Sequence, residues 1–157
     1  MIVDESYYPK RRVTVRAIVL HQGKLLCVRQ KHYDGNIITE ADVWCLPGGG
    51  LELDETITDG VRREMVEETG VEPVLGNLLY VQQFKYHGIE SLEFFFEATN
   101  AKDYLEVDLS KTTHGEIEIA EVAFVDPKTT KILPEFLMTE DLPAAAASGQ
   151  TKFFSFL

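Results

Sequence analysis

The sequence predicts an α/β fold, with helices covering a mixed central β-sheet, and three observations lead to this class. Its 157 residues are 45% hydrophobic and 26% charged, which is usual for a globular protein. Most apolar segments are short, rich in β-branched or aromatic residues and bounded by turn residues, as strands are. Residues 56–69 carry a helical apolar stripe instead, so the expected order of elements is β-β-β-α-β-β-β-α.

Segments with strand-like composition or alternation are expected to form six strands: residues 13–20, 24–30, 43–46, 77–85, 91–99 and 117–125. His21-Gln22-Gly23 is expected to join the first two as a hairpin, and Tyr86-His87-Gly88 to join the fourth and fifth. Pro47-Gly48-Gly49-Gly50 ends the third strand. The polar residues 31–42 and 100–115 are predicted to be loops.

The helix over residues 56–69 has a recognisable start and end. Thr56 is the predicted N-cap, with Asp59 three residues later in a capping-box arrangement, and Gly70 follows the last turn. The apolar stripe recurs at four-residue spacing, at Ile57, Val61 and Met65. Gly60 weakens a helix by about 1 kcal/mol relative to Ala, so something other than propensity is expected to place it there. Residues 131–139 predict a second helix.

The C-terminal part of the chain resembles a tail. Residues 143–149 resemble a linker, and an apolar end follows, with Phe153, Phe154, Phe156 and Leu157. A disordered tail would expose these side chains, so we expect them to dock on their own domain or on a partner subunit in a homodimer. We expect one domain over residues 1–157, with a core over about 10–140 and a tail over 141–157.

Composition excludes several classes of protein. The chain has 26 acidic and 15 basic residues, a net charge of −11, so a binder of DNA or RNA polymers is not expected. The two cysteines, Cys27 and Cys45, lie in apolar contexts and are interpreted as buried, reduced thiols. The N-terminal residues do not resemble a signal peptide, and no apolar run is long enough to span a membrane. The expected location is therefore the cytoplasm.

Much of the acid is concentrated in one segment. Residues 49–71 contain seven carboxylates and two arginines, a net charge of −5. On a helix, Glu64, Glu67 and Glu68 fall within about 100° of one another, where like charges repel. A divalent cation would turn this repulsion into ligation, and carboxylate oxygens suit Mg²⁺ or Mn²⁺. The alternative is an acidic surface that only faces water.

This segment resembles a known motif. The pattern Gly49-x5-Glu55-x7-Arg63-Glu64-Met65-x-Glu67-Glu68-x-Gly70-Val71 resembles the complete Nudix box, and Trp44-x-Leu46-Pro47-Gly48-Gly49 leads into it as in Nudix proteins. The resemblance implies a Nudix α/β/α sandwich over roughly residues 10–140. It also implies metal-dependent hydrolysis of a pyrophosphate bond in a nucleoside diphosphate linked to another moiety.

The resemblance assigns roles within the box. It implies that Glu67, Glu68 and the Gly48 carbonyl hold the metal and that Glu64 is a further ligand or the general base. Arg63 would orient Glu64, Glu55 would anchor the turn into the helix, and Gly49 and Gly70 would be structural. A further catalytic acid is expected near a late strand, with Glu116 preferred and Glu118 second, although both fit exposed charges equally well.

The substrate is less well specified by the sequence. Arg16 and Arg29 are candidates for phosphate contacts, and Trp44, Phe84 and Tyr86 for stacking a nucleobase, although surface arginines and core aromatics are common. The weakly favoured substrates are ADP-ribose or sugar nucleotides. Nucleoside triphosphates and dinucleoside polyphosphates are alternatives, and so is a Nudix domain that senses a nucleotide without hydrolysing it.

Overall fold

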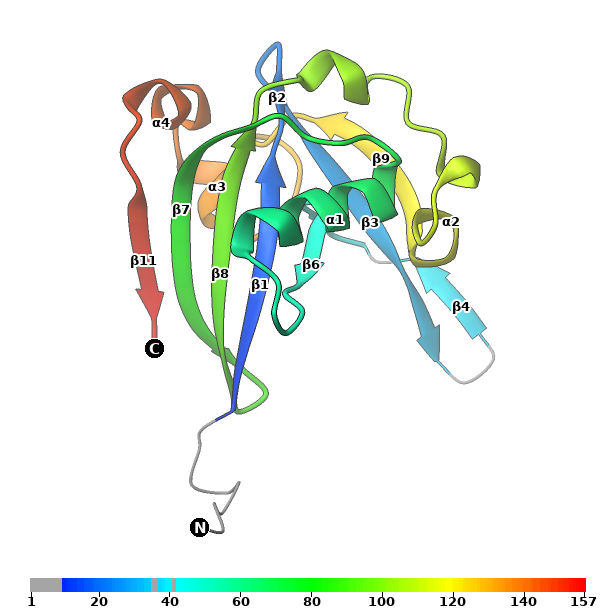
Figure 1. Cartoon of the computed structure of the whole chain (residues 1–157), viewed down its shortest axis with the longest axis horizontal. Coiled ribbons are helices and arrows are strands. Elements are labelled where there is room, and N and C mark those ends of the chain that lie inside the picture. Colours follow the sequence, from blue (N-terminus) through cyan, green and yellow to red (C-terminus); the bar gives the residue numbers. More distant parts are fainter. Residues whose placement is uncertain (1–9, 35–36, 41) are drawn as a thin grey trace, which may run out of the picture.

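The computed structural model describes residues 10–34, 37–40 and 42–157, and five of its strands form a mixed sheet (Figure 1). The strands, in spatial order, are β11 (Lys152–Phe156), β7 (Leu75–Tyr86), β8 (Ile89–Ala98), β1 (Arg11–Ile18) and β6 (Gly48–Gly50). β1 is parallel to β8 and β11 to β7, whereas the β7–β8 and β1–β6 pairs are antiparallel. The predicted α/β class with a mixed sheet is confirmed.

A second sheet forms around β3 (Lys24–Asp34). Its other strands are β2 (Leu20–His21), β4 (Ile37–Glu40), β5 (Trp44–Cys45), β9 (Ile119–Val125) and β10 (Ile132–Leu133). The helices are α1 (Ile57–Thr69), α2 (Gly115–Glu118), α3 (Phe136–Thr139) and α4 (Leu142–Ser148), with short 3₁₀ helices at Ala101–Tyr104 and Leu109–Lys111. No helix in the described part of the chain is long and apolar enough to cross a membrane.

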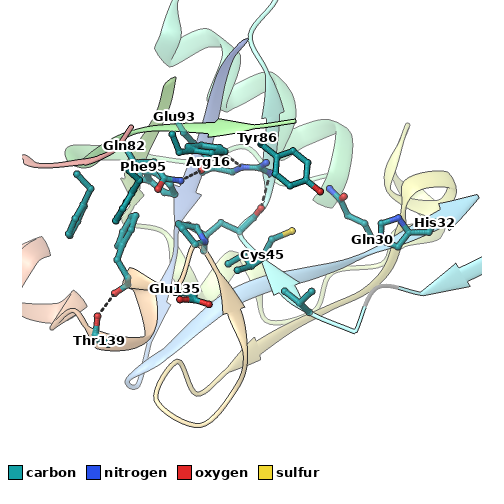
Figure 2. A pocket seen from close by; sticks show the side chains of 18 residues that line it. Arg16, Gln30, His32, Cys45, Gln82, Tyr86, Glu93, Phe95, Glu135 and Thr139 are labelled. Carbon is teal, nitrogen blue, oxygen red and sulfur yellow. Dashed lines mark hydrogen bonds and ion pairs between the residues drawn. The ribbon is translucent and has the colours of Figure 1, made fainter. Parts of the chain in front are cut away.

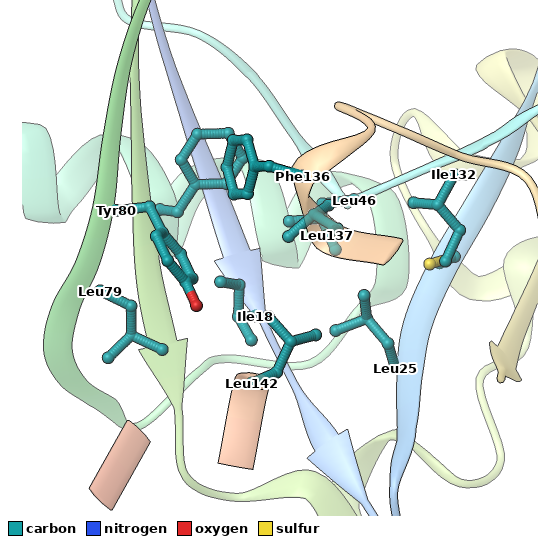
Figure 3. Packing of buried hydrophobic residues seen from close by; sticks show 11 residues of the cluster. Ile18, Leu25, Leu46, Leu79, Tyr80, Ile132, Phe136, Leu137 and Leu142 are labelled. Atoms are coloured by element: carbon teal, nitrogen blue, oxygen red, sulfur yellow. The ribbon is translucent and has the colours of Figure 1, made fainter. Parts of the chain in front are cut away.

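The five-stranded sheet buries both of its faces. Val61 and Met65 of α1 pack on one face, where Phe94 and Phe96 of β8 also lie. Phe95, between these two, points to the other face and joins a core shared with α3 and α4. Figure 3 shows Phe136 and Leu137 of α3 and Leu142 of α4 in this core. This alternation is the period of two that a strand imposes on its side chains. It places α1 on one side of the sheet and an aromatic cluster on the other.

The predicted helix is found as α1, including both ends. The Thr56 hydroxyl accepts a hydrogen bond from the Asp59 N–H at 3.1 Å, and Gly70 ends the helix with a φ of 76°. Asp59 does not close the capping box, because its carboxylate accepts from Arg62. A Cβ on Gly60 would lie 2.6 Å from a methyl carbon of Leu51, so close packing of the loop accounts for this glycine.

The first predicted hairpin is only partly confirmed. Gln22 and Gly23 do turn the chain, but the hairpin they close is the short β2–β3 pair. β1 ends at Ile18 and belongs to the other sheet, because it pairs with β6 and β8. The second predicted hairpin, formed by β7 and β8, is confirmed.

The observed secondary structure differs from the predicted one in three segments. The predicted loop over 31–42 is largely strand, since β3 continues to Asp34 and pairs with β4; residues 35, 36 and 41 lie outside the described ranges. The three glycines expected to end a strand are themselves a strand, β6. The predicted strand over 117–125 begins at Ile119, because residues 117 and 118 complete α2.

The predicted helix over 131–139 and the predicted linker over 143–149 were also wrong. The first is the strand β10 followed by the single turn α3, with Pro134 between them. The second is the helix α4, which Asp141 caps by accepting from the Ala144 N–H and which Gly149 ends. The pairing of β10 with β5, which local pattern does not show, decides the first segment. The second has local helix signals, namely Asp141 as N-cap, a proline in the first turn, a run of alanines and Gly149 at the end.

The chain end docks on its own domain. β11 adds a parallel strand to the edge of β7. The Phe154 ring stacks on Phe136 at 4.4 Å between centroids and 15° between planes. The neighbouring Phe153 points to the opposite face and is 73% exposed. The end of the chain is thus an ordered part of the sheet.

We predict that Phe154→Ala lowers the free energy of unfolding by about 2 kcal/mol, because it removes a half-buried ring from the aromatic cluster. The matched control is Phe153→Ala, which makes the same change on the outer face and is expected to cost less than about 0.5 kcal/mol. Urea unfolding of both variants measures the difference. Equal losses would show that β11 does not dock as described.

Candidate functional site

The guanidinium of Arg63 is the centre of the acidic segment. Its Nε and Nη2 donate to the two oxygens of Glu55 at 2.6 and 3.0 Å. Its Nη1 donates to Glu64 at 3.0 Å and to Glu67 at 3.1 Å, and Nη2 also reaches the Gly50 carbonyl at 3.0 Å. The hydrogen bonds from Arg63 hold the pKa of Glu55 below its usual range. One side chain therefore joins α1 to the loop that precedes it.

Glu68 lies apart from this group, on the buried side of α1. Only 3% of the residue is exposed, and its carboxylate accepts from the Gly48 N–H at 3.0 Å. Burial raises the pKa of Glu68 to about 8, and burial also raises the pKa of Glu64. These carboxylates are thus desolvated beyond what their protein partners offset.

The backbone passes very close to its neighbours at Gly48 and Gly49. Gly48 has a φ of 141°, and a Cβ there would overlap the carbonyl oxygen of Val15. A Cβ on Gly49 would lie 2.7 Å from a carboxylate oxygen of Glu64. Gly50, in contrast, has open space around it. Overlap with the backbone therefore requires glycine at Gly48, whereas at Gly49 a side chain would displace the end of Glu64.

His114 also contacts the acidic helix. Its Nδ1 lies 3.0 Å from the Glu67 carboxylate, and its backbone N–H donates to the Glu67 carbonyl at 3.0 Å. Its place in a polar loop gave no sign of this contact. Of the two late carboxylates, Glu118 lies near enough to help raise the pKa of Glu68. Glu116 is exposed, and its carbonyl accepts from Lys31.

An aromatic cavity of about 950 Å³ opens beside the box (Figure 2). Phe84 and Tyr86 of β7 line it, as the sequence suggested for a stacking site. Four further phenyl rings line it that the sequence analysis did not select for stacking, namely Phe95, Phe136, Phe154 and Phe156. Rings of this kind give a cavity suited to a flat, apolar group.

Arg16 lies between the cavity and the box. It lines the cavity, and its strand position is paired with Gly48 of β6. Its Nη1 donates to the Leu46 carbonyl at 3.1 Å, and its Nε to Glu93 at 3.2 Å. Proximity to Arg16 also partly offsets the rise in the Glu68 pKa. The Arg16 side chain therefore lines the cavity, while its strand pairs with the glycines at which the box begins.

The structure places the other two candidates elsewhere. Arg29 forms an ion pair with Glu121 of β9, and its guanidinium carbon lies 5.2 Å from the centroid of the Trp44 ring. Neither residue is among the described residues that line the cavity. Both thiols are free, and burial raises the pKa of Cys27 and of Cys45.

The donor groups of the box fit a hard divalent cation in their chemistry. All three candidate side chains supply carboxylate oxygens, and Glu68 is buried without a hydrogen-bonded cationic side chain in the described part of the chain. They do not converge as they stand: among the described residues, no three acidic, His or Cys side chains form a ready ligand cluster. Glu64 and Glu67 face Arg63 instead.

Comparison with known proteins adds a family and a fold. A family model described as NUDIX domain matches residues 10–144. A MutT-like protein from Streptomyces ambofaciens is 38% identical over 87 residues, which are 55% of this chain and 51% of that protein. YjhB of Bacillus subtilis strain 168, whose name suggests an ADP-ribose pyrophosphatase, is 31% identical over 83 residues, or 53% of this chain and 36% of that protein.

The chain thus spans about half of the first relative's length and about a third of the second's. Among solved structures, a NUDIX hydrolase from Nitrosomonas europaea aligns with a TM-score of 0.66 at 23% identity. The alignment covers 87% of this chain and 91% of that one, and it shows a shared fold.

We predict that Gly48→Ala lowers the free energy of unfolding by about 2–4 kcal/mol, because it adds backbone strain and overlaps β1. Gly50→Ala is the matched control two residues away, and it is expected to stay within about 1 kcal/mol of the wild type. Thermal unfolding compares the two variants. Similar stability for both would mean that the glycines serve only as a flexible turn.

Proposed function

This chain belongs to the Nudix family, and from that premise we propose that it hydrolyses a pyrophosphate bond in a nucleoside diphosphate linked to another moiety. The observation that carries the proposal is the meeting of two features at Arg16. An acidic helix with a complete box lies on one side of it, and an aromatic cavity lies on the other. A charged diphosphate joined to a flat base needs both environments side by side.

The acidic residues of α1, together with Gly48 and Arg63, would have these roles in the reaction. Glu67, Glu68 and the Gly48 carbonyl would hold a divalent cation, and Glu64 would be a further ligand or the general base. Such an ion, Mg²⁺ or Mn²⁺, would neutralise charge on the phosphate oxygens and activate the attacking water. Arg63 keeps Glu64 and Glu67 at fixed positions on α1. Glu118 is the nearer of the two candidates for a further acid.

The cavity supports a substrate that carries a nucleobase. Its rings can stack on a planar base, which gains about 1–3 kcal/mol per base. Its volume of about 950 Å³ is at the upper end for ligand sites, so a base and a sugar fit together. We favour ADP-ribose or a sugar nucleotide, in keeping with the name of YjhB. The intact carboxylates of the box favour catalysis over nucleotide sensing.

We predict that the protein releases a nucleoside monophosphate from ADP-ribose or a sugar nucleotide only when Mg²⁺ or Mn²⁺ is present. The panel includes nucleoside triphosphates and dinucleoside polyphosphates, and products are separated by chromatography. EDTA should abolish turnover, and excess metal should restore it. If no compound is cleaved and calorimetry detects no metal binding, the proposed function is wrong.

We predict that Glu67→Gln lowers kcat by at least about 100-fold, because it removes a charged oxygen from the metal site. The matched control is Glu52→Gln in the same acidic segment. Its side chain is 65% exposed and reaches Arg63 only at 3.7 Å. An exposed ion pair of this length contributes little, so this variant is expected to change kcat less than about 2-fold. Circular dichroism checks that both variants fold. Undiminished activity of Glu67→Gln would rule out the metal-site assignment.

A further inference from the structure

Three polar side chains form a row across the five-stranded sheet at the aromatic cavity. Gln82 of β7 is paired with Glu93 of β8, and Glu93 is paired with Thr14 of β1. All three are buried, with exposed fractions of 4%, 6% and 3%. Gln82 and Glu93 line the cavity, where Figure 2 shows them beside Phe95. A polar group thus meets any flat ligand that enters between the rings.

Glu93 fixes the orientation of the Gln82 amide. Its Oε2 accepts from the Thr14 hydroxyl at 2.7 Å and from Arg16 Nε at 3.2 Å. Its Oε1 accepts from Gln82 Nε2 at 2.9 Å. A carboxylate beside an arginine only accepts hydrogen bonds, so a flipped amide would set two oxygens against each other. The nitrogen of Gln82 therefore faces Glu93, and the amide oxygen is directed away from it.

That oxygen is an acceptor with no partner of its own. No hydrogen bond reaches Gln82 Oε1 from the part of the chain that the structure describes. The oxygen is not among the fully buried unpaired side-chain atoms of the described residues, so it faces the cavity, where water can pair with it before a ligand binds. A ligand that donates to it replaces that water, whereas a ligand that excludes the water without donating leaves the acceptor unpaired at a cost. The side chain is held by its neighbour, so its orientation is set before a ligand arrives.

We propose that Gln82 selects a base with an amino group at C6 of a purine or C4 of a pyrimidine, adenine or cytosine, over the matching bases with a carbonyl there, hypoxanthine or uracil. The inference rests on the proposed function, because that function places a nucleobase in the cavity. An amino group donates to Gln82 Oε1. A carbonyl at the same position sets two acceptors face to face, away from water. Sites built around a buried hydrogen bond discriminate strongly against ligands that cannot make it.

The neighbouring glutamine supplies a matched control. Gln83 lies on the same strand but points to the opposite face, where it donates to Glu90 at 3.3 Å. It is not among the described residues that line the cavity. Gln82→Met and Gln83→Met therefore make one chemical change on the two faces of β7, and methionine is close to glutamine in volume.

The experiment measures the affinity of the wild type and both variants for AMP, IMP, CMP and UMP by titration calorimetry. We expect the wild type to bind AMP at least about 10-fold more tightly than IMP, and CMP more tightly than UMP. Gln82→Met should lose about 10-fold in affinity for AMP and stay within about 2-fold for IMP, so the preference disappears. Gln83→Met should keep the wild-type preference.

Equal binding of AMP and IMP by the wild type, binding of none of the four nucleotides, or a preference that survives Gln82→Met would each overturn the proposal. If that variant unfolds at a lower temperature than the assay allows, Glu93→Gln replaces it. Glu93 is a positioning residue. In the Glu93→Gln variant, the new amide can donate as well as accept, so the Gln82 amide can turn over. The preference for AMP over IMP should then narrow.

Hydrolysis of ADP-ribose and of its hypoxanthine analogue gives a separate readout. The kcat/KM ratio of the two substrates should follow the binding preference in each variant. A protein that prefers AMP but hydrolyses neither compound refutes the proposed function and leaves this inference standing. A protein that hydrolyses both equally, with equal binding of AMP and IMP, keeps the function and refutes the inference.

Discussion

The contact between Arg63 and its carboxylates is the interaction on which the rest of the site depends. Without a cation, the acidic side chains of the loop and the helix would repel one another. The guanidinium offers five N–H donors in a fixed fork, and here they reach Glu55, Glu64, Glu67 and the Gly50 carbonyl. A lysine has neither this geometry nor this number of directed donors. One planar group therefore holds the loop, the end of β6 and one face of α1 together.

The same contact divides the acid into two environments. Glu64 and Glu67 face Arg63, whereas Glu68 is turned to the buried side, where its carboxylate accepts from the backbone N–H of Gly48. Gly48 of β6 also lies very close to β1, where its partner in the register is Arg16. The pairing of β6 with β1 therefore connects the acidic helix, through Gly48, to the aromatic cavity, through Arg16. The acidic residues behind the net charge of −5 in this segment thus have a defined local arrangement, which distinguishes them from the other acidic residues of the chain.

Sequence alone was sufficient where the signal was local. Thr56, the four-residue stripe and Gly70 specify α1 within one residue, and the alternation of residues 91–99 specifies β8. It was insufficient where pairing across the chain decides. Polar residues of β3 and the glycines of β6 become strands because a partner lies beside them. The segment that forms α4 is an exception, because Asp141, the alanines and Gly149 are local helix signals. β11, in contrast, takes its structure from the edge of β7. Gln82 was missed for the same reason, since its importance depends on which residue of β8 lies opposite.

Glu93 shows why register carries information that composition does not. A buried carboxylate is rarely the most stabilising choice, because well-packed apolar residues of similar volume are often neutral or better for stability. Its three donors come from three positions that only the β7–β8–β1 register brings together, namely Thr14, Arg16 and Gln82. A shift of one residue in β7 would turn Gln82 to the outer face and bring Gln83 to the cavity without the same neighbours. The Glu93 carboxylate therefore contributes orientation. It holds the Arg16 side chain between the cavity and the box, and it holds the Gln82 amide beside the space where a base would lie.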